Sequence, residues 1–116
     1  MQNPSIEILP TVKMSQKFDA CFRVFLDEKS NGMLDADELL LSGITIRSDE
    51  RFCTTDEDGV CFLYLPEGIN SVLIDASDST FSDLGFVTFQ NEVLPIAQAF
   101  EVTLFTEESF DFGLSR

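Results

Sequence analysis

The stretch Phe52–Ile74, with the sequence FCTTDEDGVCFLYLPEGINSVLI, decides the fold. Two runs of β-prone residues in it, Phe52–Thr55 and Val60–Leu65, flank the segment DEDG at positions 56–59. An Asp-Gly pair between such runs supplies the positive φ that a hairpin turn needs. The segment LPEG at positions 65–68 predicts a second turn close behind the first. The stretch therefore predicts a hairpin that leads directly into a further strand.

Short β-prone runs continue on both sides of this stretch. Eight β-prone runs can be counted, at 20–26, 41–47, 52–55, 60–65, 72–74, 86–89, 99–105 and 110–112, and we expect about seven strands from them. Strands that recur every 8–12 residues or so are typical of a β-sandwich. The chain has 12 Phe and no Trp, which suits a core between two facing sheets. The pattern predicts an all-β fold.

The first run is also compatible with a helix. Phe18, Cys21, Phe22 and Phe25 follow the spacing i, i+3, i+4, i+7 of one helix face. The strand and helix interpretations both stay open at this point, and they lead to different functions.

Length and charge exclude several classes of function. The 116 residues fit one domain, which we place at 18–114 behind a leader or linker at 1–17. A net charge of −14 excludes nucleic-acid binding as the main function and disfavours an anionic membrane surface. No apolar run is long enough to cross a bilayer. The absence of His removes Ser–His and Cys–His catalysis as well as His-ligated metals.

The start of the chain bears on its compartment. The first 16 residues lack the charged start and apolar stretch of a signal peptide. We therefore expect either a cytoplasmic protein or one module of a longer secreted chain.

The acidic residues are unevenly placed. Residues 52–115 contain twelve Asp and Glu and no Lys or Arg, so salt bridges within that half are excluded. A self-repelling surface that keeps the protein soluble is the simpler explanation. The alternative is that some carboxylates converge on a cation.

The segment 27–38, DEKSNGMLDADE, matches a twelve-position calcium loop. Calcium takes six to eight oxygen ligands, and Gly32 at the sixth position permits the sharp turn that the loop requires. Glu38, at the twelfth position, can supply two oxygens. The expected ligands are the side chains of Asp27, Asn31, Asp35 and Glu38 and the backbone carbonyl of Met33. One position departs from the pattern, because Lys29 occupies the third ligand position and a cation cannot ligate calcium. Asp37 or a water molecule would then substitute.

Cys21, Cys53 and Cys61 form no C-x-x-C pair, so zinc and redox motifs lack support. Cys53 and Cys61 flank the predicted hairpin turn and can face each other if the register allows it. We prefer the interpretation of three small buried hydrophobic side chains.

The order of these motifs resembles the calcium-binding B domains of serine-aspartate-repeat surface adhesins (SdrD B-like), relatives of Cna B-type, prealbumin-like modules. The resemblance covers roughly residues 18–114 and rests on short motifs in order. These are Phe25-Leu26-Asp27, Asn31-Gly32, Asp35 with Glu38, SGITI at 42–46, TDEDG at 55–59, LPEG at 65–68 and FDFGL at 110–114.

The resemblance implies an immunoglobulin-like (prealbumin-like) β-sandwich outside the cell, in a stalk, spacer or adhesion domain of a larger chain that calcium stiffens. It places Asp27, Asn31, Asp35 and Glu38 at ligand positions and adds Asp56 as a weaker candidate. Some Cna B-type relatives form an internal Lys–Asn or Lys–Asp isopeptide bond. Here Arg23 stands in the first strand, where a guanidinium cannot react in this way, so we expect no such bond from Lys17 or Asp111.

Two other functions stay open. The helical interpretation of the first run suits an intracellular EF-hand-like sensor, in which calcium exposes an apolar surface. A module that recognises carbohydrate or protein through its loops would use Phe81, Phe86 and Phe89, although we expect core packing for these residues. We expect no enzyme, because no motif separates a carboxylic acid from a carboxylate base.

Overall fold

The computed structural model describes residues 16–27, 38–77, 79–90 and 92–116. Nine strands form in these ranges, and no helix does. The strands are β1 (Lys17–Leu26), β2 (Thr45–Ser48), β3 (Arg51–Thr54), β4 (Val60–Pro66), β5 (Gly68–Asp75), β6 (Phe86–Phe89), β7 (Glu92–Pro95), β8 (Phe100–Leu104) and β9 (Glu108–Ser115). The helical interpretation of the first run is therefore wrong, because its residues form the ten-residue strand β1.

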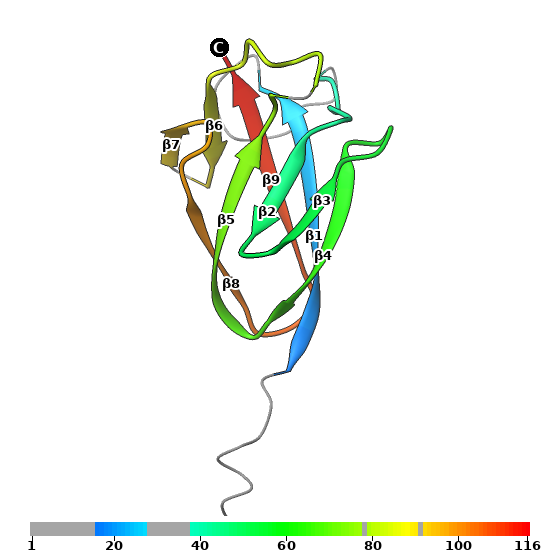
Figure 1. Cartoon of the computed structure of the whole chain (residues 1–116), viewed down its shortest axis with the longest axis vertical. Coiled ribbons are helices and arrows are strands. Elements are labelled where there is room, and N and C mark those ends of the chain that lie inside the picture. Colours follow the sequence, from blue (N-terminus) through cyan, green and yellow to red (C-terminus); the bar gives the residue numbers. More distant parts are fainter. Residues whose placement is uncertain (1–15, 28–37, 78, 91) are drawn as a thin grey trace, which may run out of the picture.

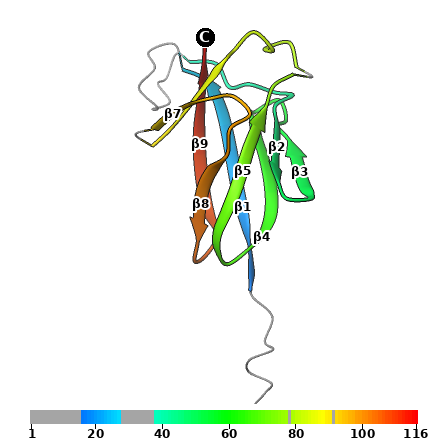
Figure 2. The same ribbon diagram turned by 60° about the vertical axis from the view of Figure 1, so that its left-hand side comes forward.

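The strands build two sheets that face each other as a sandwich (Figures 1 and 2). The first sheet has the order β4-β1-β9-β6-β7, and the second has the order β3-β2-β5-β8. β1 pairs with β9 in parallel, so the first and last strands lie side by side at the centre of the first sheet. The predicted all-β, immunoglobulin-like sandwich is confirmed, with nine strands in the described residues where about seven were expected.

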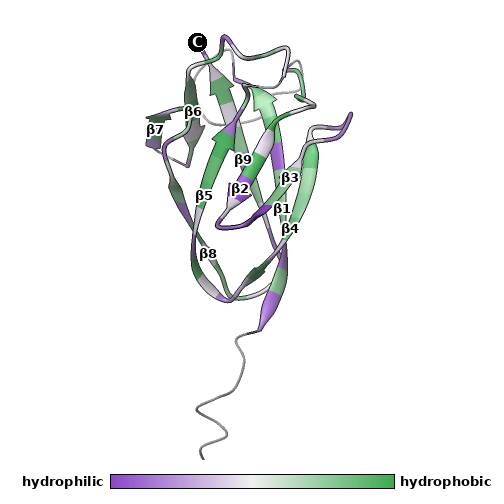
Figure 3. Ribbon diagram, viewed as in Figure 1, coloured by the Kyte–Doolittle hydropathy of each residue, from purple (hydrophilic) through white to green (hydrophobic). Residues whose placement is uncertain are grey.

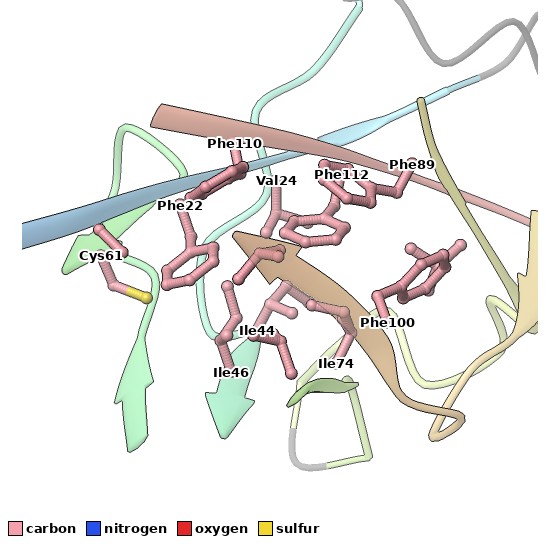
Figure 4. Close-up of a cluster of buried hydrophobic side chains, with 14 of the residues drawn as sticks. Phe22, Val24, Ile44, Ile46, Cys61, Ile74, Phe89, Phe100, Phe110 and Phe112 are labelled. Carbon is pink, nitrogen blue, oxygen red and sulfur yellow. The ribbon is translucent and has the colours of Figure 1, made fainter. Parts of the chain in front are cut away.

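The core lies between the inner faces of the two sheets. Phe22, Phe110 and Phe112 of the first sheet point toward Ile46 and Ile74 of the second (Figure 4). Adjacent rings pack at centroid distances of 4.5–6.0 Å, a range that suits aromatic pairs. Because successive side chains of a strand point to opposite faces, β4 alternates buried and exposed residues along its length.

The predicted hairpin is wrong, because β3 and β4 belong to different sheets and do not pair with each other. The segment 56–59 instead forms a turn that leads from one sheet to the other, here called the β3–β4 turn. Asp56 closes this turn, because the Asp56 Oδ1 atom accepts the N–H groups of Asp58 at 2.9 Å and Val60 at 3.1 Å. Gly59 adopts a φ of 74°, which an Asp-Gly turn requires. The β3–β4 turn is hydrophilic, whereas the strands hold most of the hydrophobic residues (Figure 3).

A disulfide joins Cys53 of β3 to Cys61 of β4, with Cα atoms 5.8 Å apart. It links an edge strand of one sheet to an edge strand of the other. Our preference for three unbonded cysteines is wrong for this pair, and Cys21 is the free cysteine of the described residues. The packing of the two sheets brings these two cysteines together, and the local sequence does not determine that packing.

Candidate metal centre

The structure brings together the two ends of the acidic segment 27–38. The Leu26 N–H donates to the Leu39 carbonyl at 2.8 Å, and the Leu41 N–H donates to the Val24 carbonyl at 2.9 Å. Between these bonds, Phe25 and Leu40 form an antiparallel bridge. The chain that leaves β1 therefore returns beside it. Asp27 and Glu38, the first and last predicted ligands, each adjoin a residue of the hydrogen-bonded pair Leu26–Leu39.

Asp27 is fully buried at the end of β1. Its backbone N–H donates to the Leu114 carbonyl of β9 at 2.9 Å. Its side chain lies against Gly113, where an added Cβ would stand 2.7 Å from Asp27 Cβ and 2.9 Å from Asp27 Oδ2. A glycine is required at this position because any side chain would displace the carboxylate. The closing motif FDFGL thus contributes to the site through its glycine.

The other predicted ligands are only partly covered by the described residues. Glu38 is half-buried at the start of the returning chain. Asn31, Met33 and Asp35 lie outside the described residues, so their roles stay predictions. Within the described ranges, no group of three or more His, Cys, Asp or Glu side chains is placed to hold a metal ion. One oxygen of Asp56, the weaker candidate, accepts two N–H groups of the β3–β4 turn.

Two further threonines lie near the site. Thr55 is buried, and its hydroxyl donates to the Leu41 carbonyl at 2.7 Å and accepts the Ile44 N–H at 3.0 Å. It fixes the chain that follows the acidic segment against the β3–β4 turn. Thr88 of β6 is also buried, and it pairs with Gly113 of β9. Thr55 belongs to the TDEDG motif, which assigned its side chain no role, and Thr88 within a β-prone run gave no sequence signal.

A bidentate ion pair links β1 to β9. Arg23 Nε and Nη2 donate to the two carboxylate oxygens of Asp111 at 3.0 and 2.9 Å. The hydrogen bonds to Asp111 raise the pKa of Arg23 above its ordinary value. Side chains 42% and 38% exposed place this pair partly in water, so its contribution to stability is modest.

The phenylalanines considered for a recognition surface divide between core and surface. Phe89 is a core residue, Phe81 packs against the core, and Phe86 of β6 is 42% exposed. More exposed aromatic rings lie on β4, where Phe62 and Tyr64 are 61% and 57% exposed. The expected core packing is confirmed for Phe81 and Phe89 and is wrong for Phe86, which is partly exposed.

A cleft with a volume of about 530 Å³ lies between the β2–β3 and β4–β5 turns. Its lining includes Asp49, Glu50 and Arg51, and the Arg51 guanidinium donates to the Tyr64 carbonyl at 2.9 Å. No residue of the metal candidate lines it. Among the described residues, no helix is long and apolar enough to cross a membrane.

Comparison with known proteins adds little to this geometry. No family model matches the chain, and no curated protein matches it. Two solved structures of the pilus-presented adhesin Spy0125 (Cpa), one of them a cysteine-to-alanine mutant, are similar to it at 13% and 16% identity, both with a TM-score of 0.36. The matches cover 86% and 98% of this chain but only 27% and 28% of the adhesin chains. The fold therefore rests on the strand pairing itself: the chain is a two-sheet β-sandwich with an acidic segment anchored at one end.

Proposed function

We propose that this chain is a calcium-stabilised, non-enzymatic structural module of a larger secreted or cell-surface protein, acting as a stalk, spacer or adhesion domain. The observation that carries the proposal is the fully buried carboxylate of Asp27 at the first position of the twelve-residue segment. The joined ends of that segment support it further, because a calcium loop must bring its first and twelfth positions together.

Bound calcium would act here through stability and not through chemistry. Asp27 and Glu38 would hold the ion, together with Asn31, the Met33 carbonyl and Asp35 as the sequence pattern indicates. An ion that binds the folded state alone stabilises it by mass action, by about 2.7 kcal/mol at a hundred-fold excess over Kd. The ion would also offset the repulsion among carboxylates in a chain of net charge −14.

The disulfide supports a location outside the cytosol. Disulfides such as Cys53–Cys61 persist in oxidising compartments and are rare in the cytosol of most cells. The intracellular EF-hand-like sensor lacks the helix that should lead into its loop, because β1 stands in that place. The proposal therefore favours the secreted module over the sensor.

Thermal unfolding in millimolar CaCl2 and in excess EGTA tests the proposal. We expect calcium to raise the midpoint of the wild type, and Asp27→Asn to remove most of that rise. Asp49→Asn is the matched control, because Asp49 is an exposed carboxylate at the β2–β3 turn and its positive φ suits asparagine. A wild-type midpoint that is the same in calcium and in EGTA would contradict the proposal.

A further inference from the structure

Thr88 is buried on a sheet face where solvent exposure would be expected. Its neighbours Val87 and Phe89 belong to the core between the sheets. Because side chains alternate along a strand, Thr88 points to the outer face of the first sheet. It is nevertheless only 3% exposed. Its hydroxyl is the buried side-chain group that lacks a hydrogen-bond partner among the described residues.

An unpaired buried hydroxyl is costly, since folding removes it from water without replacing the lost hydrogen bond. Such a group calls for an explanation, and a bound ion or an ordered water molecule is a common one. The unpaired hydroxyl of Thr88 therefore indicates a bound ligand on the outer face of the first sheet.

The strand register places Thr88 beside the candidate metal centre. Thr88 pairs with Gly113 across β6 and β9, and Gly113 pairs with Phe25 across β9 and β1. Phe25 is also fully buried yet stands outside the core cluster, and its ring lies against Gly113. Asp27 places its carboxylate over the same glycine. Thr88 and the carboxylate of Asp27 thus both adjoin Gly113, Thr88 from the neighbouring strand β6 and Asp27 from the position that follows β1.

We propose that the Thr88 hydroxyl oxygen is a further ligand of the cation that Asp27 binds, directly or through one water molecule. This inference rests on the proposed function. Calcium takes six to eight oxygens, and a hydroxyl oxygen is an acceptor with two lone pairs. The twelve-residue segment has Lys29 at its third ligand position and so lacks one oxygen there. Thr88 supplies an oxygen from outside the segment and couples the ion to β6.

The test compares Thr88→Val with Thr88→Ser by calcium titration calorimetry and by thermal unfolding with CaCl2 or EGTA. Valine keeps the shape of threonine and removes the hydroxyl, whereas serine keeps the hydroxyl. We expect Thr88→Val to weaken calcium binding roughly 10-fold or more, as loss of groups that support metal ligands typically does. Thr88→Ser keeps the wild-type affinity within about a factor of three. Thr103→Val, at an exposed threonine of β8, is the matched control.

The unfolding midpoint in EGTA is a second measurement. If the Thr88 hydroxyl only supported the fold, its removal would not raise this midpoint. Removal of an unpaired buried hydroxyl should raise the unfolding midpoint of the calcium-free protein, while the rise on adding calcium shrinks. If Thr88→Val fails to fold, Thr88→Ala is the second variant without a hydroxyl.

Wild-type calcium affinity in the variants that lack the hydroxyl would overturn this inference and leave the proposed function intact. Absence of calcium binding by the wild type would overturn both.

Discussion

The buried hydroxyl of Thr55 satisfies two backbone groups of the chain that follows the acidic segment, the Leu41 carbonyl and the Ile44 N–H. Thr55→Val keeps the side-chain shape and leaves both groups buried without their partner. We expect a loss of about 2–4 kcal/mol in the free energy of unfolding, because each unsatisfied buried group costs ~1–3 kcal/mol. Urea denaturation measures this loss.

Thr54 offers a matched control one residue away. It is exposed, and its hydroxyl contacts that of Thr45 at 3.4 Å on the surface. Thr54→Val should change the free energy of unfolding by less than ~0.5 kcal/mol, as is usual for surface substitutions. Equal effects of the two valine substitutions would show that the Thr55 hydroxyl does not anchor this segment.

Gly113 allows the Asp27 carboxylate to lie against β9. Gly113→Ala would place a Cβ 2.7 Å from Asp27 Cβ and 3.0 Å from Phe25 Cζ, so both side chains must move. We expect a loss of about 1–3 kcal/mol from overpacking, measured by urea denaturation in EGTA. A loss of the calcium response should accompany it.

Gly85→Ala controls for the general effect of replacing glycine. An added Cβ at Gly85 meets no atom within 4 Å, and its φ lies outside the positive range. This variant should keep both the stability and the calcium response. A Gly113→Ala protein with the wild-type stability and calcium response would contradict the placement of Asp27.

Asp75 makes stability depend on pH in a known direction. The Ser77 N–H donates to the Asp75 Oδ1 atom at 2.8 Å, and the hydrogen bonds from Ser77 lower the pKa of this carboxyl below its ordinary 3.8. A lowered pKa in the folded state stabilises the protein above the ordinary pKa, and this contribution is lost as pH falls through the lowered pKa. Asp75→Asn should therefore lose less stability than the wild type when urea midpoints are compared between about pH 6 and pH 3. A larger loss in the variant would contradict this sign.

At the scale of the strands, the sequence predicted those elements that turn signals and β-prone runs define. The Asp-Gly and LPEG turns stand where expected, and they bound β4 on both sides. β7 was missed because its sequence EVLP is short, ends in proline and is mostly exposed, so it lacks the alternation of a half-buried strand. β9 extends beyond the predicted segment 110–112 at both ends.

The residues of the candidate site also fall into two groups, those that the sequence indicated and those that it did not. Asp27 and Glu38 were indicated because their spacing within one segment matches the pattern of a calcium loop, and local spacing is visible in a sequence. The contributions of Thr88 and Gly113 depend on the pairing of β6 and β1 with β9, which joins residues far apart in the chain. Such pairing follows from how the whole sheet assembles, so neither residue type nor local pattern could identify these two positions.

The Cys53–Cys61 disulfide closes one side of the sandwich, since it joins the edge strands β3 and β4 of opposite sheets. Loop-closure entropy for so short a loop gives a stabilisation of about 2.5 kcal/mol. The double variant Cys53→Ala with Cys61→Ala should therefore have a lower urea midpoint than the wild type. Addition of a phosphine reductant should lower the wild-type midpoint similarly and leave that of the double variant unchanged. Cys21→Ala retains the disulfide, so the reductant should lower its urea midpoint as it does for the wild type. A wild-type midpoint that the reductant does not change would argue against the disulfide.

At the scale of the whole molecule, the net charge of −14 and the proposed calcium ion should make separable contributions to stability. Ion pairs such as Arg23–Asp111 and Arg116–Asp83 neutralise few of the 21 acidic residues. Repulsion among the others is screened by any salt, with a Debye length of ~10 Å at about 0.1 M. KCl should therefore raise the unfolding midpoint, and CaCl2 at the same ionic strength should raise it further.

Two charge variants separate screening from site binding. Glu57→Lys, at an exposed position of the β3–β4 turn, lowers the net negative charge by two units and should weaken the response to KCl. It should keep the additional rise that calcium gives, because Glu57 is not part of the proposed site. Asp27→Asn should show the opposite pattern, with a normal KCl response and no additional rise from calcium. If CaCl2 and KCl act equally on the wild type at matched ionic strength, charge screening explains the whole effect and no specific ion is held.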